Sequence, residues 1–526
     1  MDRGTTVLEA ARTLGVDLDS VCGGRGLCGR CQVVPVGDEP PLTGPGPDEE
    51  RYRRRRGLAD DRRLGCRAGI LGDLTVDVPP ESQLHRQVVR KRVEVEDLVV
   101  DPVVRLHYVP VEPARLDTPS GATERVLAAL VDEWGLGGLS VDARSIGDLQ
   151  AAAATGEATV AVRDGSIVVA AWPGFRDVAL GAAFDIGSTT IAGHLVDLAS
   201  GETLASAGRM NPQIRFGEDL MSRVSHVMMH PEGAADLTRV VREAVDELLG
   251  ELVADAGVGR TDVLELVAVG NPIMHHLLFG LDVRPLGEAP FALAVSSAID
   301  VDAAALGVSA HPAARLHALP LIAGHVGADA AAAILSEAPH RSDALQLVVD
   351  VGTNAEIVLG SRGRVLAASS PTGPAFEGAQ ISSGQRAAPG AIERVRIDRD
   401  TLEPRFRVIG VEGWSDDPGF DDAGVGISGI CGSGIIEAVA ELYLTGLVDP
   451  DGRFASDAAD RTARVTSDGR AQAYELTDGV SVTQNDVRAI QLAKAALYAG
   501  VRLLMDHLGV DEVEEIRLAG AFGSHI

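Results

Sequence analysis

The sequence predicts a multidomain α/β protein, and three observations carry this prediction. The chain has 526 residues, enough for about three or four domains of ordinary size. Segments with helical periodicity alternate with segments of strand-like periodicity along most of it. The motif DIGSTT at 185–190 returns as DVGTNAE at 350–356, and each copy follows an apolar strand-like run. Two related half-domains are therefore expected.

The composition is that of a globular protein, because 45% of the residues are hydrophobic and 23% are charged. The net charge of −29 would repel phosphate backbones and anionic membrane surfaces, so we expect no nucleic-acid or membrane partner. The N-terminus has early charges and no apolar core of signal-peptide length. No run of about 20 apolar residues occurs, so a cytoplasmic protein with reduced thiols is expected.

The cysteines gather near the N-terminus. Cys22, Cys28 and Cys31 form a CxxxxxCxxC pattern, and Cys66 follows in RLGCRAG. Four thiolates in one short domain suit a tetrahedral zinc or an iron-sulfur cluster, and disulfides are the weaker explanation in a reducing compartment. Only one CxxC pair is present, whereas zinc sites usually combine two. Four glycines between Cys22 and Cys31 favour a cluster, because small residues let backbone amides turn toward its sulfurs.

The segments around these cysteines carry a recognisable order of elements. Apolar positions at helical spacing predict a helix within 5–18, and strands are expected at 31–37 and 73–80. Helix, ligand loop, strand, lone fourth cysteine and closing strand resemble the [2Fe-2S] ferredoxins, with the first ligand spacing of the adrenodoxin type. The resemblance implies that residues 1–82 form a β-grasp ferredoxin-like domain whose four cysteines bind a [2Fe-2S] cluster. Only four residues precede Thr5, so the sheet is expected to lack the hairpin that opens such ferredoxins.

Residues 83–179 are predicted to be a connecting strand followed by a small α+β linker domain. The helices are expected at 122–135 and 145–154, and the strands at 158–165 and 166–174. No chemistry is assigned to this part of the chain.

Two hairpins carry the next chemical signal. In the first, an apolar strand ends at Asp185 and a Gly/Ser/Thr turn leads into a second strand; the second hairpin repeats this order from Asp350. Such turns present backbone amides and hydroxyls to a phosphate, and an aspartate at a strand end can bind Mg²⁺ through water. The candidate residues of the two turns are Gly187, Ser188, Thr189, Thr190, Gly352, Thr353, Asn354 and Glu356.

Two further glycine-rich elements follow. Gly432, Ser433 and Gly434 stand at a predicted helix start, where free amides and the helix dipole favour anions. A strand from residue 516 ends in Gly520 and Gly523, where the backbone can lie flat against a nucleotide base.

The two hairpins and the two glycine-rich elements together resemble the superfamily of acetate and sugar kinases, heat-shock chaperone ATPases and actin. The resemblance implies a duplicated ATPase fold with halves at 180–342 and 343–526. It also implies that Asp185 and Asp350 organise Mg²⁺ and water, that the turn residues hold the phosphates of ATP, and that Gly520 faces adenosine. Glu356 is the candidate general base or water-positioning group. Because the chain stops soon after Gly523, the ATPase fold is expected to lack its closing helix.

A ferredoxin-like head joined to this ATPase resembles the ATP-dependent reductive activators of corrinoid proteins. The segments 267–280, 323–335, 372–395 and 491–504 look like signature segments of that family. The resemblance implies ATP-dependent electron transfer that returns Co(II) to Co(I) in a corrinoid protein of a methyltransferase system. It also implies an upstream low-potential electron donor, and it leaves a homodimer open.

Two other classes of protein remain open at this stage. The first is a metabolite kinase of the same fold with a ferredoxin sensor, and the second is a ferredoxin-type carrier with a degenerate ATPase half. Activators of radical dehydratases lack a ferredoxin head.

Some residues are predicted to have only structural roles. Cys431 is expected to be an inert buried thiol, and His275 and His276 are expected at the margin of a core. The arginine run 51–56 is expected to be a solvated loop rather than a docking patch.

Overall fold

The computed structural model describes residues 3–14, 16, 18, 26, 29, 31–37, 40–79, 82, 99–117, 119–217, 219–352, 354–378, 380–420, 425–468 and 471–520. The chain divides into two compact units. The first comprises Met1–Val88, Gln213–His226 and Pro339–Ile526. The second comprises Val89–Pro212 and Val227–Ala338.

The N-terminal region contains a small sheet in the strand order β2-β1-β3, with β1 antiparallel to both neighbours. A buried apolar cluster that includes Val7, Leu8, Val33 and Leu64 joins the first helix to this sheet. The helix and both strands predicted from the sequence are present. The elements are α1 (Val7–Leu14), β1 (Gln32–Pro35), α2 (Pro47–Arg56), β2 (Arg63–Leu64) and β3 (Val76–Asp77).

The arginine run 51–56 is not a loop, and that prediction was wrong. It forms the last two turns of α2. Pro47 stands at the first helical position, three acidic residues fill the first turn, and Gly57 ends the helix in the left-handed conformation with φ +73°. Arginine is itself a good helix former, so these start and stop signals outweighed the polarity that suggested a loop.

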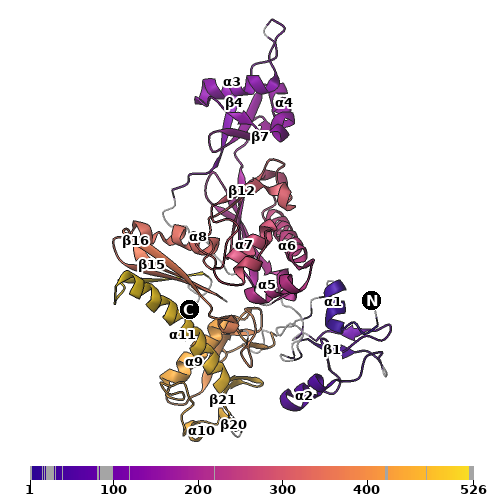
Figure 1. Ribbon diagram of the computed structural model, residues 1–526, viewed down its shortest axis with the longest axis vertical. Coiled ribbons are helices and arrows are strands. Elements are labelled where there is room, and N and C mark those ends of the chain that lie inside the picture. The colour runs from indigo at the N-terminus through magenta and orange to yellow at the C-terminus, as the bar shows by residue number, and fades with distance from the viewer. Residues whose placement is uncertain are drawn as a thin grey trace. The chain divides into compact units, whose positions relative to one another are not determined.

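The linker region is an α+β domain whose four-stranded sheet has the order β4-β6-β7-β5. Helices α3 and α4 cover one face of this sheet, as seen in Figure 1, and their contact buries Leu130 and Leu149 completely. The predicted helices and strands are confirmed. The elements are β4 (Val104–Pro110), α3 (Ala122–Trp134), β5 (Ser140–Val141), α4 (Ile146–Ala154), β6 (Glu157–Arg163) and β7 (Ile167–Pro173).

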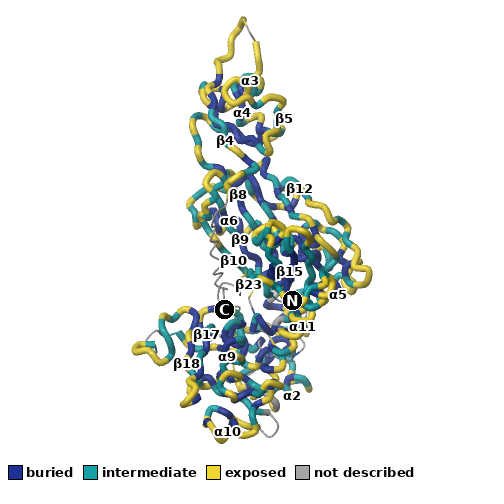
Figure 2. Tube along the Cα trace, turned by 90° about the vertical axis from the view of Figure 1, so that its left-hand side faces the viewer, coloured by how far each residue is buried: buried dark blue, intermediate teal, exposed yellow. Residues whose placement is uncertain are grey.

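The middle region is built on a six-stranded sheet in the order β10-β9-β8-β11-β13-β12. Strand β8 is antiparallel to β9 and parallel to β11, and Figure 2 shows β8 as largely buried. The strands are β8 (Leu180–Ile186), β9 (Thr190–Asp197), β10 (Thr203–Met210), β11 (Val263–Val269), β12 (Ile299–Asp302) and β13 (Arg315–Ala318). The helices are α5 (Leu220–Met229), α6 (Gly233–Asp255), α7 (Pro272–Phe279) and α8 (Ala328–Glu337).

The C-terminal region contains a four-stranded sheet in the order β16-β15-β14-β23 and two three-stranded sheets, β18-β17-β19 and β20-β21-β22. The strands are β14 (Gln346–Val351), β15 (Ala355–Ser361), β16 (Arg364–Ser370), β17 (Ala391–Ile397), β18 (Pro404–Val408), β19 (Gly429–Ile430), β20 (Val465–Asp468), β21 (Ala471–Thr477), β22 (Val480–Thr483) and β23 (Glu515–Ala519). The helices are α9 (Gly432–Leu444), α10 (Ala458–Arg461) and α11 (Gln484–Leu508).

Short 3₁₀ helices complete the fold. They are η2 (Ala143–Ser145), η3 (Pro212–Arg215), η4 (Arg260–Asp262), η5 (Arg284–Leu286), η6 (Ala303–Leu306), η7 (Pro339–Arg341) and η8 (Pro374–Glu377).

The two sheets that carry the predicted hairpins share one topology. In each, a three-stranded antiparallel meander is followed by a distant strand that pairs in parallel with the first strand of the meander. Asp185 and Asp350 both lie near the carboxyl end of that first strand. The repeat found in the sequence is thus matched by a repeat in strand order.

A buried ion pair ties the linker region to the middle region within the second unit. The Arg163 guanidinium donates two hydrogen bonds of 2.8 Å to the Glu265 carboxylate, and both side chains are at least 85% buried. Arg163 is also paired with Asp300, so it keeps a second carboxylate when Glu265 is replaced. We expect Glu265→Gln to lower the free energy of unfolding by about 1.5 to 3 kcal/mol, because it removes the more deeply buried of the two carboxylates that pair with this cation. Urea unfolding measures this loss. The exposed pair Arg239–Glu243 gives the control: Glu243→Gln should cost about 1 kcal/mol or less, and equal losses would contradict the prediction.

Candidate functional site

The described ligand candidates of the cysteine cluster lie in adjacent segments. The pairing of β1 with β2 brings Gln32 opposite Leu64, and the Gly65 amide donates a 2.7 Å hydrogen bond to the Cys31 carbonyl. Cys31 and Cys66 are both buried, with 1% and 5% of their surfaces exposed. Cys31 and Cys66, which are far apart in the sequence, thus lie in neighbouring segments at one end of the strand pair β1–β2.

The loop between the ligand cysteines depends on glycine. Gly26 and Gly29 have φ angles of +73° and +68°, a conformation that favours glycine. A Cβ on Gly29 would overlap the Tyr52 ring of α2, and a Cβ on Gly26 would lie 2.8 Å from Nε of Arg67. At these two described positions the backbone lies close to Tyr52 of α2 and to Arg67, so a larger residue would require its neighbours to move.

Two features fit a thiolate-bound cluster: the two thiols are buried, and Gly26 and Gly29 allow a close approach of the backbone. Cys22 and Cys28 lie outside the described residues. In the part of the chain that the structure describes, no group of three His, Cys, Asp or Glu side chains is arranged to hold a metal ion.

The first hairpin turn is held by a buried asparagine. The Gly187 amide donates to the Thr190 carbonyl at 3.0 Å, and a Cβ on Gly187 would lie 2.6 Å from the same oxygen. The Asn211 side chain donates to the Gly187 carbonyl at 2.8 Å, and its backbone amide donates to the Thr189 carbonyl at 2.8 Å. Ser188 is buried and Asp185 is half-buried. Asn211 was not predicted, because it is 24 residues from Gly187 in the sequence.

Two helix N-termini lie beside this turn. Asn271 caps α7 by accepting hydrogen bonds from the Ile273 and Met274 amides at 3.1 and 3.0 Å. The Ala328 amide at the start of α8 donates to the Gly270 carbonyl at 3.0 Å, and a Cβ on Gly270 would lie 2.7 Å from the Ile186 carbonyl. The segments 267–280 and 323–335, noticed in the sequence without a role, therefore meet at the carboxyl ends of β8 and β11.

The second hairpin turn has the same construction. The Gly352 amide donates to the Asn354 carbonyl at 3.1 Å, and the Thr372 hydroxyl donates to the Gly352 carbonyl at 2.8 Å. Thr372 thus corresponds to Asn211 in the first turn, and it too was missed in the sequence. Thr353 lies outside the described residues.

Two carboxylates face each other across this hairpin. Asp350 and Glu356 are directly opposite in the antiparallel register of β14 and β15, so their side chains project from the same face of the sheet. Glu356 is 9% exposed, and its Oε1 accepts a hydrogen bond of 3.2 Å from the Ser369 hydroxyl. The structure therefore brings together two of the three predicted catalytic residues.

The last glycine-rich element adjoins the same aspartate. Strand β23 pairs in parallel with β14 so that Ala519 lies opposite Asp350. Gly520 follows with φ +75°, and a Cβ there would overlap the Asp350 carboxylate. Gly523 lies outside the described residues. Asp350, Glu356 and Gly520 form one compact group.

The helix start at Gly432 is also as predicted. Cys431 is the residue before α9, and Gly432, Ser433 and Gly434 form its first turn. A Cβ on Gly434 would overlap the Ile392 carbonyl of β17, so the helix packs directly on that strand. Cys431 is 2% exposed, its Sγ lies 3.2 Å from the Ser433 hydroxyl, and burial raises the pKa of its thiol. These features fit the expected inert thiol.

The two adjacent histidines of α7 are buried in the middle region. The His276 ring is hydrogen-bonded to the Pro272 carbonyl at 2.8 Å and to the Ala294 amide at 3.1 Å. His275 is 5% exposed, its ring nitrogens have no hydrogen-bond partner among the described residues, and burial lowers its pKa to about 4. Both are core residues rather than partner-facing groups.

We expect this burial to make the protein acid-sensitive. Unfolded His275 titrates near its ordinary pKa of about 6.5, so between pH 6.5 and about 4 the unfolded chain binds a proton that the folded chain refuses. Stability falls as pH falls through this window, by about 3 kcal/mol from this residue. His275→Phe should flatten the slope of unfolding free energy against pH, measured by urea titration. The same change at the exposed His340 is the control, and parallel slopes for His275→Phe and wild type would contradict the prediction.

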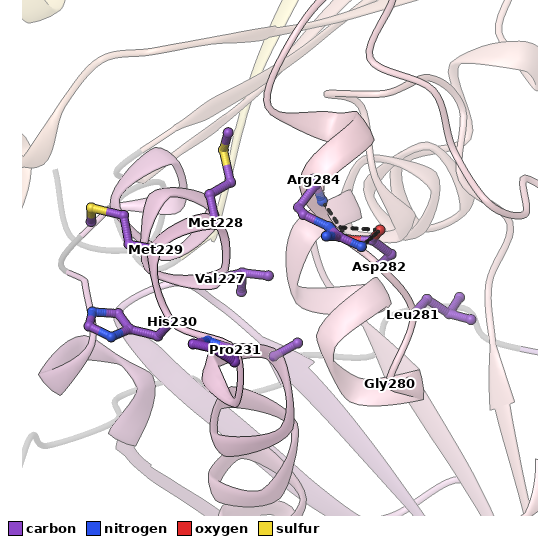
Figure 3. A pocket seen from close by; sticks show the side chains of 10 residues that line it. Val227, Met228, Met229, His230, Pro231, Gly280, Leu281, Asp282 and Arg284 are labelled. Atoms are coloured by element: carbon purple, nitrogen blue, oxygen red, sulfur yellow. Dashed lines mark hydrogen bonds and ion pairs between the residues drawn. The ribbon is translucent and has the colours of Figure 1, made fainter.

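A pocket of about 390 Å³ opens in the middle region, as Figure 3 shows. Met228, Met229 and His230 line one side of it, and Asp282 and Arg284, which are ion-paired at 2.7 Å, line the other. The described candidate residues for nucleotide binding are not among its lining residues. No motif in the sequence pointed to this pocket.

Among the described helices, none is both long enough and apolar enough to cross a lipid bilayer.

Four protein-family models match the chain. They are the "2Fe-2S iron-sulfur cluster binding domain" at residues 1–70, the "RACo linker region" at 93–178, the "RACo middle region" at 180–342 and the "C-terminal domain of RACo the ASKHA domain" at 344–526.

Two curated relatives each match about two thirds of the chain. "Corrinoid activation enzyme RamQ" of Eubacterium limosum is 35% identical over 361 residues, which are 66% of this chain and 58% of RamQ. The "[Co(II) methylated amine-specific corrinoid protein] reductase" of Methanosarcina barkeri is 27% identical over 375 residues, which are 66% of this chain and 63% of the reductase. The match thus spans less than two thirds of each relative.

One solved structure matches nearly the whole chain. The "Reductive activator for corrinoid,iron-sulfur protein" superposes with a TM-score of 0.72 at 28% identity, over 99% of this chain and 84% of the other. The likeness includes every region described above.

Proposed function

Because the chain belongs to the RACo family, we propose that it uses ATP to drive electrons from a [2Fe-2S] cluster to a corrinoid protein, returning its cobalt from Co(II) to Co(I). One observation carries this proposal: a cluster-binding domain and an ASKHA domain stand in succession on one chain. The names of the two relatives, a corrinoid activation enzyme and a Co(II) corrinoid protein reductase, support the choice of substrate.

On the electron-transfer side, we assign Cys22, Cys28, Cys31 and Cys66 as cluster ligands within a domain at 1–82. A [2Fe-2S] cluster takes up and releases one electron at a time, which matches the one-electron step from Co(II) to Co(I). The burial of Cys31 and Cys66 and the tight glycine loop support this assignment, because they hold thiolates away from water. A low-potential electron carrier must supply the electron.

On the nucleotide side, we assign ATP binding to the predicted halves 180–342 and 343–526. Asp185 and Asp350 would bind Mg²⁺ through water, while the amides and hydroxyls of the two turns would hold phosphate oxygens. Glu356 would position the attacking water, because its hydrogen bond with Ser369 fixes a carboxylate beside Asp350. Gly520 would let the backbone lie flat against adenosine. Gly432, Ser433 and Gly434 would offer helix-start amides to an anion.

ATP contributes to such a reaction only through a difference between states. The ATP-bound form must bind the corrinoid protein with a different affinity from the ADP-bound form, or must favour a different coordination of its cobalt. The linker at 83–179 is assigned no chemistry, and the Arg163–Glu265 ion pair joins it to the middle region.

ATP hydrolysis gives a direct test. The reconstituted protein should hydrolyse MgATP slowly, and a corrinoid protein in the Co(II) state should stimulate this rate. The same assay should yield free phosphate and no phosphorylated small acceptor. Transfer of the γ-phosphate to a metabolite would instead identify a kinase.

A further inference from the structure

The second half of helix α2 begins a strongly basic segment of an acidic protein. Residues 51–67 contain eight arginines and two aspartates, while the whole chain has a net charge of −29. Because an acidic partner would be repelled by most of this surface, this segment is one of the few that would attract it.

The inner face of α2 is fixed to the small sheet. The Glu49 carboxylate is fully buried, accepts hydrogen bonds of 2.8 and 3.0 Å from Arg63, and accepts another of 2.9 Å from the Leu64 amide. Arg53 also turns inward, because its guanidinium donates to the carbonyls of Leu58, Ala59 and Arg62. The helix therefore has one defined orientation.

The outer face presents Arg51 and Arg54, which are three residues apart and so lie on the same side of the helix. Both are exposed, and the Arg51 side chain is 59% accessible. Its contact with Asp48 is an exposed ion pair of 3.5 Å, which water weakens and a partner carboxylate can replace. Guanidinium groups bind carboxylates through two hydrogen bonds, so this face is suited to an acidic surface.

The same helix contacts described residues that are near Cys31 and Cys66 in the sequence. Tyr52 packs on Gly29, two residues before Cys31, and Arg67, which follows Cys66, is paired with Asp48 of α2 at 3.1 Å. A redox partner bound on the outer face of α2 would therefore dock on a helix that contacts residues close in sequence to Cys31 and Cys66.

We propose that Arg51 and Arg54 form the docking surface for a small acidic electron-carrier protein with a low-potential redox group. This inference rests on the proposed function only in that the cluster must receive electrons from a protein. Electrostatic attraction would raise the association rate, and salt would reduce it.

The test measures reduction of the cluster itself. Reduced flavodoxin with an acidic face is the probe, and stopped-flow absorbance follows the second-order rate at about 20 and 200 mM salt. We expect the wild-type rate to fall with salt. Arg51→Glu/Arg54→Glu should be slower by about ten-fold or more at low salt and nearly independent of salt, and Arg51→Gln/Arg54→Gln should be intermediate.

The control pair is Arg239→Glu/Arg362→Glu, which makes the same charge change at exposed, ion-paired arginines elsewhere. It should reduce the flavodoxin rate by less than about two-fold. Iron content and the rate of reduction by methyl viologen radical should match wild type in all three double variants. A match shows that the cluster is intact. An equal loss in the control pair, or an unchanged rate in Arg51→Glu/Arg54→Glu, would overturn the proposal.

A second readout separates this inference from the proposed function. With methyl viologen as donor, Arg51→Glu/Arg54→Glu should reduce Co(II) at the wild-type rate. If only this step slows while the flavodoxin rate is kept, the arginines serve the corrinoid protein or this chain's own acidic surface, and the proposal is wrong. If no variant reduces cobalt, the proposed function fails, while the flavodoxin rates still decide the docking surface.

Discussion

Replacing Cys66 with serine is expected to remove the visible absorbance of the [2Fe-2S] cluster and to abolish electron delivery to cobalt. Cys66 is 5% exposed and follows Gly65, whose amide donates a hydrogen bond to the Cys31 carbonyl, so its backbone is held beside that of Cys31. A serine hydroxyl keeps the shape of the side chain but does not supply a thiolate at neutral pH. Iron analysis and the visible spectrum measure the loss, and ATP hydrolysis without the corrinoid protein should persist.

Cys431→Ser is the matched control for this experiment. Cys431 is also a buried cysteine, at 2% exposure, but it lies before α9 beside Ser433. We expect this variant to keep the iron and the absorbance of the wild type. A Cys66→Ser protein with a full complement of iron and sulfide would refute the assignment of Cys66 as a ligand.

The second large effect is expected at the nucleotide site. Glu356→Gln should lower the rate of ATP hydrolysis by about 100-fold or more, because it removes the carboxylate that we assign to water positioning. ATP affinity should change little, since the proposed phosphate contacts come from the turn amides and hydroxyls. Glutamine fits the same space and can still accept the hydrogen bond from Ser369.

Release of inorganic phosphate measures turnover, and equilibrium binding of a fluorescent ATP analogue measures affinity. The control is Glu403→Gln, which removes an exposed carboxylate paired with Arg464 at 2.8 Å in the same region of the chain. Normal turnover in the Glu356→Gln protein would show that this carboxylate has no part in hydrolysis.

The elements that could be predicted are those with local signals. The strands around Asp185 and Asp350 and the helix start at Gly432 follow from runs of apolar residues punctuated by glycine, and the structure has them. The arginine run 51–56 was wrongly predicted to be a loop, even though the signals for helix α2 are local too. Pro47 and the acidic residues after it mark the start of this helix, and Gly57 marks its end. We gave these signals too little weight because the arginines between them are so polar.

The strand register and the hydrogen bonds between distant residues could not be predicted from the sequence. Asn211 and Thr372 hold the two turns by hydrogen bonds to the glycine carbonyls, across 24 and 20 residues of chain. The placement of Gly520 beside Asp350 depends on the parallel pairing of β14 with β23, whose partners are 169 residues apart. Such contacts depend on which strands become neighbours, and one sequence alone carries little information about that.

The central claim is that ATP makes cobalt reduction by this protein possible. The most direct measurement follows the cobalt absorbance of a Co(II) corrinoid protein mixed with the reduced, cluster-loaded protein, with and without MgATP. We predict that Co(I) forms only with ATP, and that the Glu356→Gln protein, which we expect to bind ATP with little turnover, forms little of it. Formation of Co(I) at the same rate without ATP, or its absence in the presence of ATP and a reduced cluster, would contradict the claim.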